Sequence, residues 1–152
     1  MAMAIRVEVP PDTASTTCLT TNLGWLLDQA GAVLSRELAA ALEPLGLGSR
    51  GYCVLASALG EDHTQIELAK LIGLDKTTMV VTIDALEAAG LAERRPSTAD
   101  RRVRVIAVTK AGERKVEQAR AIVEQVQADV LARLPARERE TLMKGLSRIV
   151  SH

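Results

Sequence analysis

Apolar side chains recur every three or four residues along much of the chain, the spacing that places them on one face of an α-helix. Between Asn22 and Leu42 eight apolar residues keep this spacing, which predicts a long amphipathic helix. After Thr109 the apolar residues alternate at three- and four-residue steps and predict a second long helix with a coiled-coil-like seam: Val116, Ala119, Val123, Val126 and Val130. Pro135 is expected to open a final helix.

Three shorter helices are predicted between the long ones. The first is expected to begin at a Ser49 cap and to end at Gly60. Thr64 and Glu67 have the spacing of a capping box, in which the two side chains satisfy backbone N–H groups that the first turn of a helix leaves unpaired. The second short helix should therefore begin at Gln65.

The third short helix is predicted to follow a tight glycine turn. Gly73 can adopt the left-handed conformation of such a turn, and Asp75 can cap the helix that comes next. Gly90 is expected to end that helix. Its apolar residues form one buried stripe, and the opposite side displays Lys76, Thr77 and Thr82.

From Leu91 onward the apolar repeat shortens to two residues, the repeat of a β-strand. Strands are predicted over 91–95 and 102–108, on either side of a turn at 96–100. The second strand should bury Val103, Val105 and Ala107 and expose Arg102 and Arg104. Helix, glycine turn, helix and basic hairpin in direct succession predict a winged helix-turn-helix.

Composition favours a helical protein with a modest core. The chain has 152 residues, of which 47% are hydrophobic and 25% are charged, as expected for one globular domain. It has no phenylalanine, and its two aromatic residues are Trp25 and Tyr52. A core of Leu, Val, Ile, Ala and Met is typical of packed helices, so the predicted fold class is mainly α with one small β-hairpin.

Charge is unevenly distributed along the chain, although the formal net charge is zero. Residues 1–62 contain three arginines and seven acidic residues, so the rest of the chain carries a net charge of +4. Five arginines are concentrated on the predicted hairpin: Arg94, Arg95, Arg101, Arg102 and Arg104. Basic residues clustered on one element are the electrostatic footprint of nucleic-acid binding.

Several classes of protein are disfavoured by the sequence. Cys18 and Cys53 do not belong to any group with metal-ligand spacing, so no metal or other cofactor is expected. The chain has no glycine-rich phosphate loop and no nucleophile elbow, which argues against an enzyme. No apolar run or signal segment points to a membrane or to export, so we expect a cytoplasmic protein. Cys53 lies in an apolar stretch and is expected in the core.

Three stretches of sequence resemble one family of regulators. They are LAKLIGLDKTT at 68–78, LEAAGLAER at 86–94 and DRR at 100–102, followed by Val108, Thr109 and Gly112. On these motifs residues 23–150 resemble the MarR family of winged helix-turn-helix transcriptional regulators. The resemblance implies a homodimer whose N- and C-terminal helices interlock, with two winged lobes facing successive major grooves of a pseudo-palindromic DNA operator.

The resemblance also implies a division of the chain into functional parts. The expected parts are a flexible arm (1–21), an N-terminal dimerisation helix (22–48), a DNA-binding lobe (49–108) and C-terminal dimerisation helices (109–152). Family analogy favours a repressor that a small molecule releases from DNA over an activator.

DNA contacts are expected from the hairpin and from the third short helix. The resemblance implies that Arg102 enters the minor groove and that Asp100 braces it, while the alternative is a surface ion pair of little energetic value. The full set of expected DNA-contacting residues is Lys76, Thr77, Thr78, Thr82, Arg94, Arg95, Asp100, Arg101, Arg102 and Arg104.

The third short helix departs from the commoner family pattern. Where relatives often carry arginine, this chain has Val81 and Ala85, so bidentate recognition of a purine by this helix is not expected. Its lysine and threonines are expected to contact phosphates, thymine methyls or single base acceptors. Arg102 is expected to favour a narrow, A·T-rich minor groove.

Other residues leave alternatives open. Trp25, Arg50 and Tyr52 could line a pocket for a small aromatic or lipophilic effector, although packing in the core is the alternative for both aromatic residues. Cys18 could indicate a redox-sensing regulator, but its position differs from that of the reactive cysteine in the peroxide-sensing branch of the family. A winged-helix module that binds protein would normally lack the basic wing.

Overall fold

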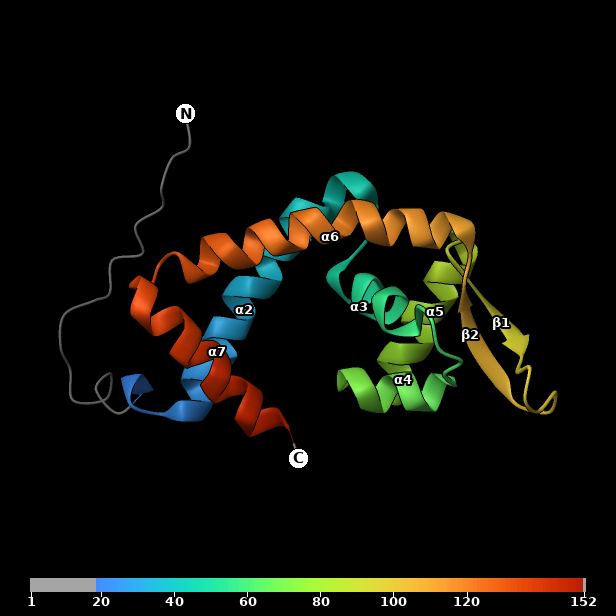
Figure 1. Ribbon diagram of the computed structural model, residues 1–152, viewed down its shortest axis with the longest axis horizontal. Coiled ribbons are helices and arrows are strands. Elements are labelled where there is room, and N and C mark those ends of the chain that lie inside the picture. Colours follow the sequence, from blue (N-terminus) through green and yellow to red (C-terminus); the bar gives the residue numbers. More distant parts are fainter. Residues whose placement is uncertain (1–18, 152) are drawn as a thin grey trace. The chain divides into compact units, whose positions relative to one another are not determined.

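The computed structural model describes residues 19–151 of the chain (Figure 1). These residues belong to two compact units, one ending at Val33 and the other beginning at Leu34, which are described separately. Of the arm predicted over 1–21, residues 1–18 lie outside the described residues, and Cys18 lies outside them as well.

The first unit contains the beginning of helix α2 (Leu23–Leu42), which confirms the long helix predicted from Asn22. The Asn22 side chain accepts a hydrogen bond of 2.9 Å from the backbone N–H of Trp25, so it satisfies one of the free donors of the first turn. Trp25 itself is half-buried. Three leucines of this part of the helix are exposed: Leu23, Leu26 and Leu27.

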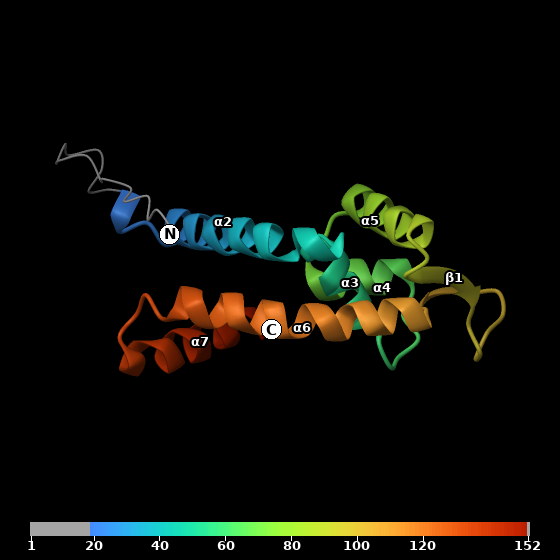
Figure 2. The same cartoon turned by 90° about the horizontal axis from the view of Figure 1, so that it is seen from above.

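The second unit contains the end of α2 and all the remaining elements (Figures 1 and 2). In chain order they are η1 (Glu43–Leu45), α3 (Ser49–Ala58), α4 (Gln65–Ile72), α5 (Lys76–Ala88), β1 (Ala92–Pro96), β2 (Arg104–Val108), α6 (Lys110–Leu131) and α7 (Ala136–Val150). The fold is mainly helical with one two-stranded antiparallel sheet, as predicted. No helix within residues 19–151 is long and apolar enough to span a membrane.

The core of the second unit is formed by side chains from the end of α2 and from α3 to α6. Its fully buried large residues are Leu42, Val54, Leu55, Leu68, Met79, Ile83, Ile106 and Val116. The residues of the seam predicted along α6 differ in how deeply they are buried. Val116, Ala119 and Val123 are buried in this core, whereas Val126 and Val130 are half-buried. The first half of the α6 seam therefore anchors α6 to its own lobe.

Local capping explains where the short helices begin and end. Thr64 and Glu67 form the predicted capping box, and Gly73 ends α4 in the left-handed conformation with φ of 69°. One prediction was wrong, because the N-cap of α3 is Gly48, which has no side chain to accept a bond, and Ser49 is the first helical residue.

The hairpin is shorter than the sequence pattern predicts. β1 and β2 pair in antiparallel register with Ala92 opposite Val108 and Pro96 opposite Arg104. Val103 was expected on the buried face, but it lies in the turn and is exposed. Its backbone closes that turn, accepting a 2.8 Å bond from the N–H of Ser97.

Ile106 breaks the expected alternation of buried and exposed residues on β2. Val105, Ile106 and Ala107 are all buried. The backbone N–H of Ile106 donates to the carbonyl of His63 at 2.9 Å, so β2 has a neighbour on its second edge as well. The residues before α4 therefore attach to the wing directly.

Helix α6 approaches the base of the wing at a glycine. A Cβ atom on Gly112 would lie 2.1 Å from the carbonyl oxygen of Leu91 and 2.7 Å from a methyl group of Val108. Thr109 caps α6 by accepting a bond from the Gly112 N–H, and its hydroxyl donates to the Gly90 carbonyl at 2.7 Å. The glycine and the threonine together fix α6 to the turn between α5 and β1.

Cys53 does not lie in the core, contrary to the prediction. Gly51, Val54, Leu55 and Ala58 are the buried residues of α3, and Cys53 falls on the opposite, exposed side of the helix. Neighbouring atoms still desolvate the thiol enough to raise its pKa above the ordinary value. A raised pKa reduces the thiolate fraction and hence the reactivity of this cysteine.

Candidate nucleic-acid interface

Helix α5 begins with a cap that also fixes one of the predicted contact residues. The Asp75 carboxylate accepts a 2.9 Å bond from the Thr78 N–H and a 2.5 Å bond from the Thr78 hydroxyl. These hydrogen bonds lower the pKa of Asp75. The carboxylate therefore stays ionised and holds the first turn of α5 in place.

The residues predicted to contact DNA on α5 differ in how far they are available to a ligand. Lys76 and Thr77 are exposed in the first turn. The hydroxyls of Thr78 and Thr82 are both engaged within the helix, because Thr82 donates to the Thr78 carbonyl at 2.7 Å. Each of these two residues can still accept a hydrogen bond or present its methyl group.

At the tip of the wing, Asp100 holds Arg102. Its carboxylate accepts bonds from Nε and Nη2 of Arg102, at 3.2 and 3.1 Å, and from the Arg102 backbone N–H at 3.0 Å. The Arg102 side chain is nevertheless 91% exposed. The same interactions lower the pKa of Asp100. The guanidinium is therefore oriented by its neighbour and projects into solvent.

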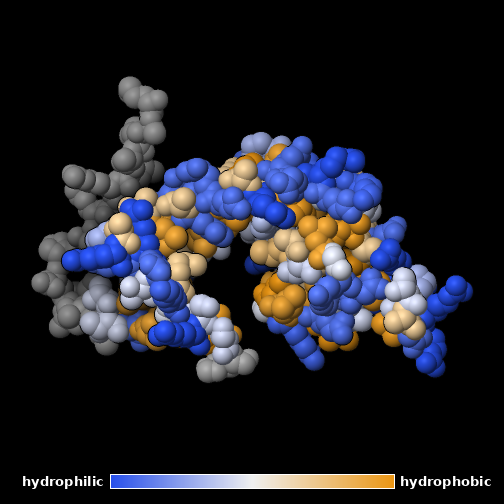
Figure 3. Space-filling view, viewed as in Figure 1, coloured by the Kyte–Doolittle hydropathy of each residue, from blue (hydrophilic) through white to orange (hydrophobic). Residues whose placement is uncertain are grey.

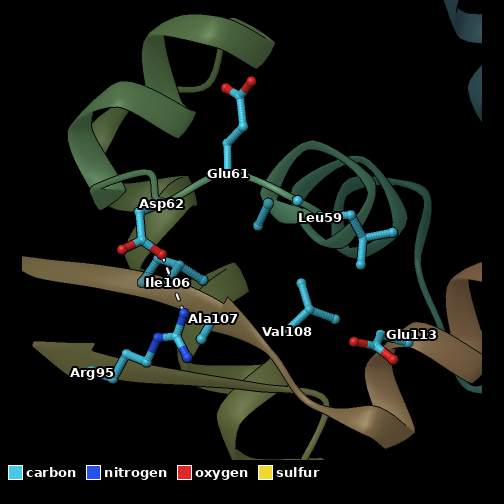
Figure 4. Close-up of a pocket in the computed structure, with 10 residues that line it drawn as sticks. Leu59, Glu61, Asp62, Arg95, Ile106, Ala107, Val108 and Glu113 are labelled. Carbon is cyan, nitrogen blue, oxygen red and sulfur yellow. Dashed lines mark hydrogen bonds and ion pairs between the residues drawn. The ribbon is translucent and has the colours of Figure 1, made fainter. Parts of the chain in front are cut away.

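Arg95 attaches the wing to the loop that precedes α4. Its Nη2 lies 3.2 Å from Oδ1 of Asp62, and the Thr98 hydroxyl donates to Oδ2 of the same carboxylate at 3.3 Å. Figure 4 shows Arg95 and Asp62 pointing toward each other at the edge of a cavity of about 270 Å³. The Arg95 bond is the main cause of a lowered pKa at Asp62.

Arg94 points toward α5, unlike the other arginines of the hairpin. It forms ion pairs with Glu87 and with Asp84, the latter at 2.7 Å, and its Nη2 donates to Gln65 at 3.3 Å. The Arg94 and Glu87 side chains are each 30% exposed. In this arrangement the guanidinium joins the wing to α4 and α5, and its contact with DNA remains a prediction.

Arg101 and Arg104 complete the basic wing. Both are exposed, and neither forms an ion pair with another described residue. In Figure 3, strongly hydrophilic side chains project from the wing end of the lobe, beside white and orange ones. The wing therefore carries four exposed arginines: Arg95, Arg101, Arg102 and Arg104.

Of the predicted effector residues, Arg50 lies at a groove. It lines a mostly apolar groove of about 280 Å³, the Arg50 groove, between residues 46–51 and α5, whose lining includes Val81, Thr82, Ala85 and Leu86. Tyr52 is half-buried against the core and does not line this groove. Trp25 belongs to the first unit, whereas Arg50 and Tyr52 belong to the second unit.

The sequence reasoning missed the acidic partners that hold the wing. Asp62, Asp84 and Glu87 each bind an arginine of β1, and none of them was singled out. For Asp84 and Glu87 the available signal was their place shortly before Gly90 with a basic residue shortly after it, since such a turn brings the two charges together. Among residues 19–151 no three His, Cys, Asp or Glu side chains converge to hold a metal ion.

Comparison with known proteins places this geometry among transcription regulators. The MarR family model matches residues 59–103. A MarR family protein of Mycobacterium tuberculosis, Rv2887, solved in complex with salicylic acid, is 32% identical, with 85% of this chain and 96% of that chain covered and a TM-score of 0.71.

Two further solved structures are similar over nearly their whole length. CouR from Rhodococcus jostii RHA1, solved bound to p-coumaroyl-CoA, is 32% identical, with 86% of this chain and 93% of that chain covered and a TM-score of 0.76. A mutant of MarR from E. coli, solved in complex with operator DNA, is 25% identical, with 91% and 99% covered and a TM-score of 0.77.

Proposed function

The chain belongs to the MarR family of transcriptional regulators, and on this premise we propose that it is a repressor that binds duplex DNA as a homodimer and is released by a small-molecule effector. The observation that carries the proposal is the pair of Asp100 and Arg102, which presents an oriented and almost fully exposed guanidinium at the tip of a basic wing. Because its proposed ligand is DNA, the protein would act in the cytoplasm.

Two elements would contact the duplex together. Helix α5 fits the major groove, where base pairs expose distinguishable groups, and the wing reaches the adjacent minor groove through Arg102. Arg95, Arg101 and Arg104 would lie near phosphates, where positive charge displaces the counterions of DNA. The relative solved in complex with operator DNA supports DNA as the ligand.

Dimerisation is supported by apolar side chains that the single chain leaves exposed. On α7 they are Leu142, Met143, Ile149 and Val150, and on the first turns of α2 they are Leu23, Leu26 and Leu27. Apolar surface gathered on one helix in this way marks an interaction site. A second copy of the chain would bury these side chains and duplicate the DNA-binding lobe.

The Arg50 groove is the proposed effector site. Its apolar lining suits an aromatic ring, and the exposed Arg50 guanidinium suits a carboxylate. Two relatives were solved with salicylic acid and with p-coumaroyl-CoA. Because Val81, Thr82 and Ala85 of α5 form one wall of this groove, a ligand there would favour conformations in which α5 fits DNA poorly.

The proposed function is tested by DNA binding at several salt concentrations. The full chain is titrated against a duplex from the intergenic region beside its own coding sequence and against a scrambled duplex. We expect tighter binding to the intergenic duplex, with affinity falling linearly in a double-logarithmic plot against salt. Addition of salicylate is expected to weaken binding, and Arg50→Ala should abolish that effect.

A matched pair of variants tests the role of the wing. Arg102→Ala should weaken binding at least about tenfold, because it removes a DNA contact from each subunit. Arg148→Ala removes the same charge from an exposed position on α7 and should leave the affinity unchanged. Binding that is insensitive to salt, or that survives the charge reversal Arg102→Glu, would contradict the proposal.

A further inference from the structure

One exposed face of α5 carries methyl groups and no charge. Thr77, Val81 and Ala85 follow one another at four-residue steps and therefore lie on one side of the helix. All three are exposed, and Val81 is 63% accessible. We call these three residues the α5 strip. The buried residues of α5 lie on another side, so the core of the lobe does not cover the strip. Val81 and Ala85 also form part of one wall of the Arg50 groove.

Hydrogen-bond donors next to the α5 strip are already in use. The Thr78 hydroxyl donates to Asp75 at 2.5 Å, and the Thr82 hydroxyl donates to the Thr78 carbonyl at 2.7 Å. A hydroxyl group has a single hydrogen to donate, so neither residue can donate to a base without losing its present bond. Neither of these two hydroxyls is therefore a free donor for guanine or adenine, and the donors that α5 keeps free, Lys76 and the Thr77 hydroxyl, lie in its first turn.

The charged residues of α5 lie away from the middle of the helix or are already paired. Asp84 and Glu87 are its acidic residues, and the Arg94 guanidinium pairs with both. Lys76 is its one basic residue and lies in the first turn. The middle of the helix, around Val81, therefore offers a ligand an apolar surface.

The major groove contains one base-edge group that matches such a surface, the C5-methyl group of thymine. The other base edges present donors and acceptors, which would lose water against valine and alanine without gaining a partner. We therefore propose that the α5 strip recognises thymine methyl groups, so that operator specificity on this helix depends on methyl contacts. The inference rests on the proposed function, because it requires α5 in the major groove.

A uracil scan tests the inference directly. The probe is a duplex recovered by binding-site selection with the full chain, in which each thymine in turn is replaced by deoxyuridine, which lacks only the methyl group. At one or two positions in each half-site the affinity should fall about fourfold, the factor that corresponds to burial of one methyl group. The same change in both half-sites should lower it about sixteenfold. A flat scan would overturn the inference.

Variants of the protein assign the methyl contact to the strip. In Val81→Ala the loss caused by uracil at a sensitive position should shrink to less than about twofold, because the two changes remove the same contact. Leu71→Ala is the matched control, since Leu71 is also 63% exposed but lies on α4, and it should keep the full loss. An undiminished loss in Val81→Ala would show that another residue recognises the methyl group.

Replacing a sensitive thymine by cytosine or by 5-methylcytosine distinguishes methyl recognition from recognition of the shape of A·T-rich DNA. A duplex with 5-methylcytosine there should bind about fourfold more tightly than the duplex with cytosine. Equal affinities would contradict the inference.

Failure of the proposed function has a different signature. Without any preference for the selected duplex over a scrambled one, sequence-specific DNA binding and the methyl contact would both be refuted. A clear preference with a flat uracil scan would refute only the methyl contact.

Discussion

The carboxylate of Glu87 accepts two hydrogen bonds from Arg94, one from its backbone N–H at 2.7 Å and one from its guanidinium. Glu87 lies in the last turn of α5, and Arg94 lies in the middle of β1. One residue pair therefore sets the angle between the helix proposed for the major groove and the wing proposed for the minor groove. This geometry assigns Arg94 a positioning role.

Arg94→Ala and Arg102→Ala should therefore affect DNA binding in different ways. Arg102→Ala should lower the slope of log affinity against log salt by about two per dimer, because each subunit loses one cation that displaces counterions when it enters the minor groove. Arg94→Ala should weaken binding with an unchanged slope. It should also lower the free energy of unfolding by about 1–3 kcal/mol, because Glu87 loses its partner. Equal reductions of the slope would contradict the positioning role of Arg94.

Gly112→Ala should destabilise the protein strongly. The added Cβ would meet the Leu91 carbonyl oxygen at 2.1 Å, and backbone cannot retreat as a flexible side chain can. We expect a loss of about 3 kcal/mol or more in urea denaturation. Gln118→Ala, at an exposed position of the same helix, is the control and should change stability by less than about 0.5 kcal/mol. Similar midpoints for the two variants would refute the close approach.

The cap of α5 should make stability depend on pH in a defined direction. Hydrogen bonds from Thr78 lower the pKa of Asp75 below its value of about 3.9 in the unfolded chain. The stabilisation by ionised Asp75 is therefore present above about pH 3.9 and is lost as the pH falls through the lowered pKa of the folded state.

Asp75→Asn isolates this contribution, because asparagine also caps helices but does not titrate. Urea midpoints of the two proteins should differ most near neutral pH, and the difference should shrink as the solution is acidified to about pH 3. A constant difference over that range would show that Asp75 does not contribute to the pH dependence.

Ile149→Glu should separate the proposed dimer into monomers. Ile149 is 55% exposed on α7, and a carboxylate placed in an apolar interface loses its hydration without a partner. The dissociation constant should rise at least about a hundredfold, which analytical ultracentrifugation measures. Lys144→Glu also places a carboxylate on α7, on the side away from the exposed apolar residues of this helix, and should leave the dimer intact. If both variants sediment with the same molecular mass, the result would contradict this interface.

Local signals in the sequence predicted where α4 and α5 begin. The capping box at Thr64 and the cap at Asp75 both involve partners three residues away, so short-range chemistry decides them. The position of Cys53 was also available from the sequence. The apolar residues Val54, Leu55 and Ala58 share one side of the predicted helix, and residue 53 lies opposite that side.

The acidic partners of the wing arginines could not be predicted in the same way. Charge clustering marked the hairpin as basic, but it did not distinguish Arg94, which points toward α5, from Arg102, which points into solvent. The direction in which each of these arginines points depends on the turn at Gly90 and on where β1 begins. Val103 was misplaced for a related reason, because β2 begins at Arg104, two residues later than the strand predicted from the apolar alternation.

Helix α6 is an unbroken rod of 22 residues, about 33 Å long at about 1.5 Å per residue, and both of its ends are attached. Thr109 and Gly112 fix the first end to the base of the wing, and Arg133, just after the second end, pairs with Glu37 of α2. A tilt of about 10° at the α2 end would move the wing by about 6 Å, nearly twice the base-pair rise of about 3.4 Å. The length of α6 therefore lets a small rotation at its α2 end shift the wing by more than one base-pair step along the duplex.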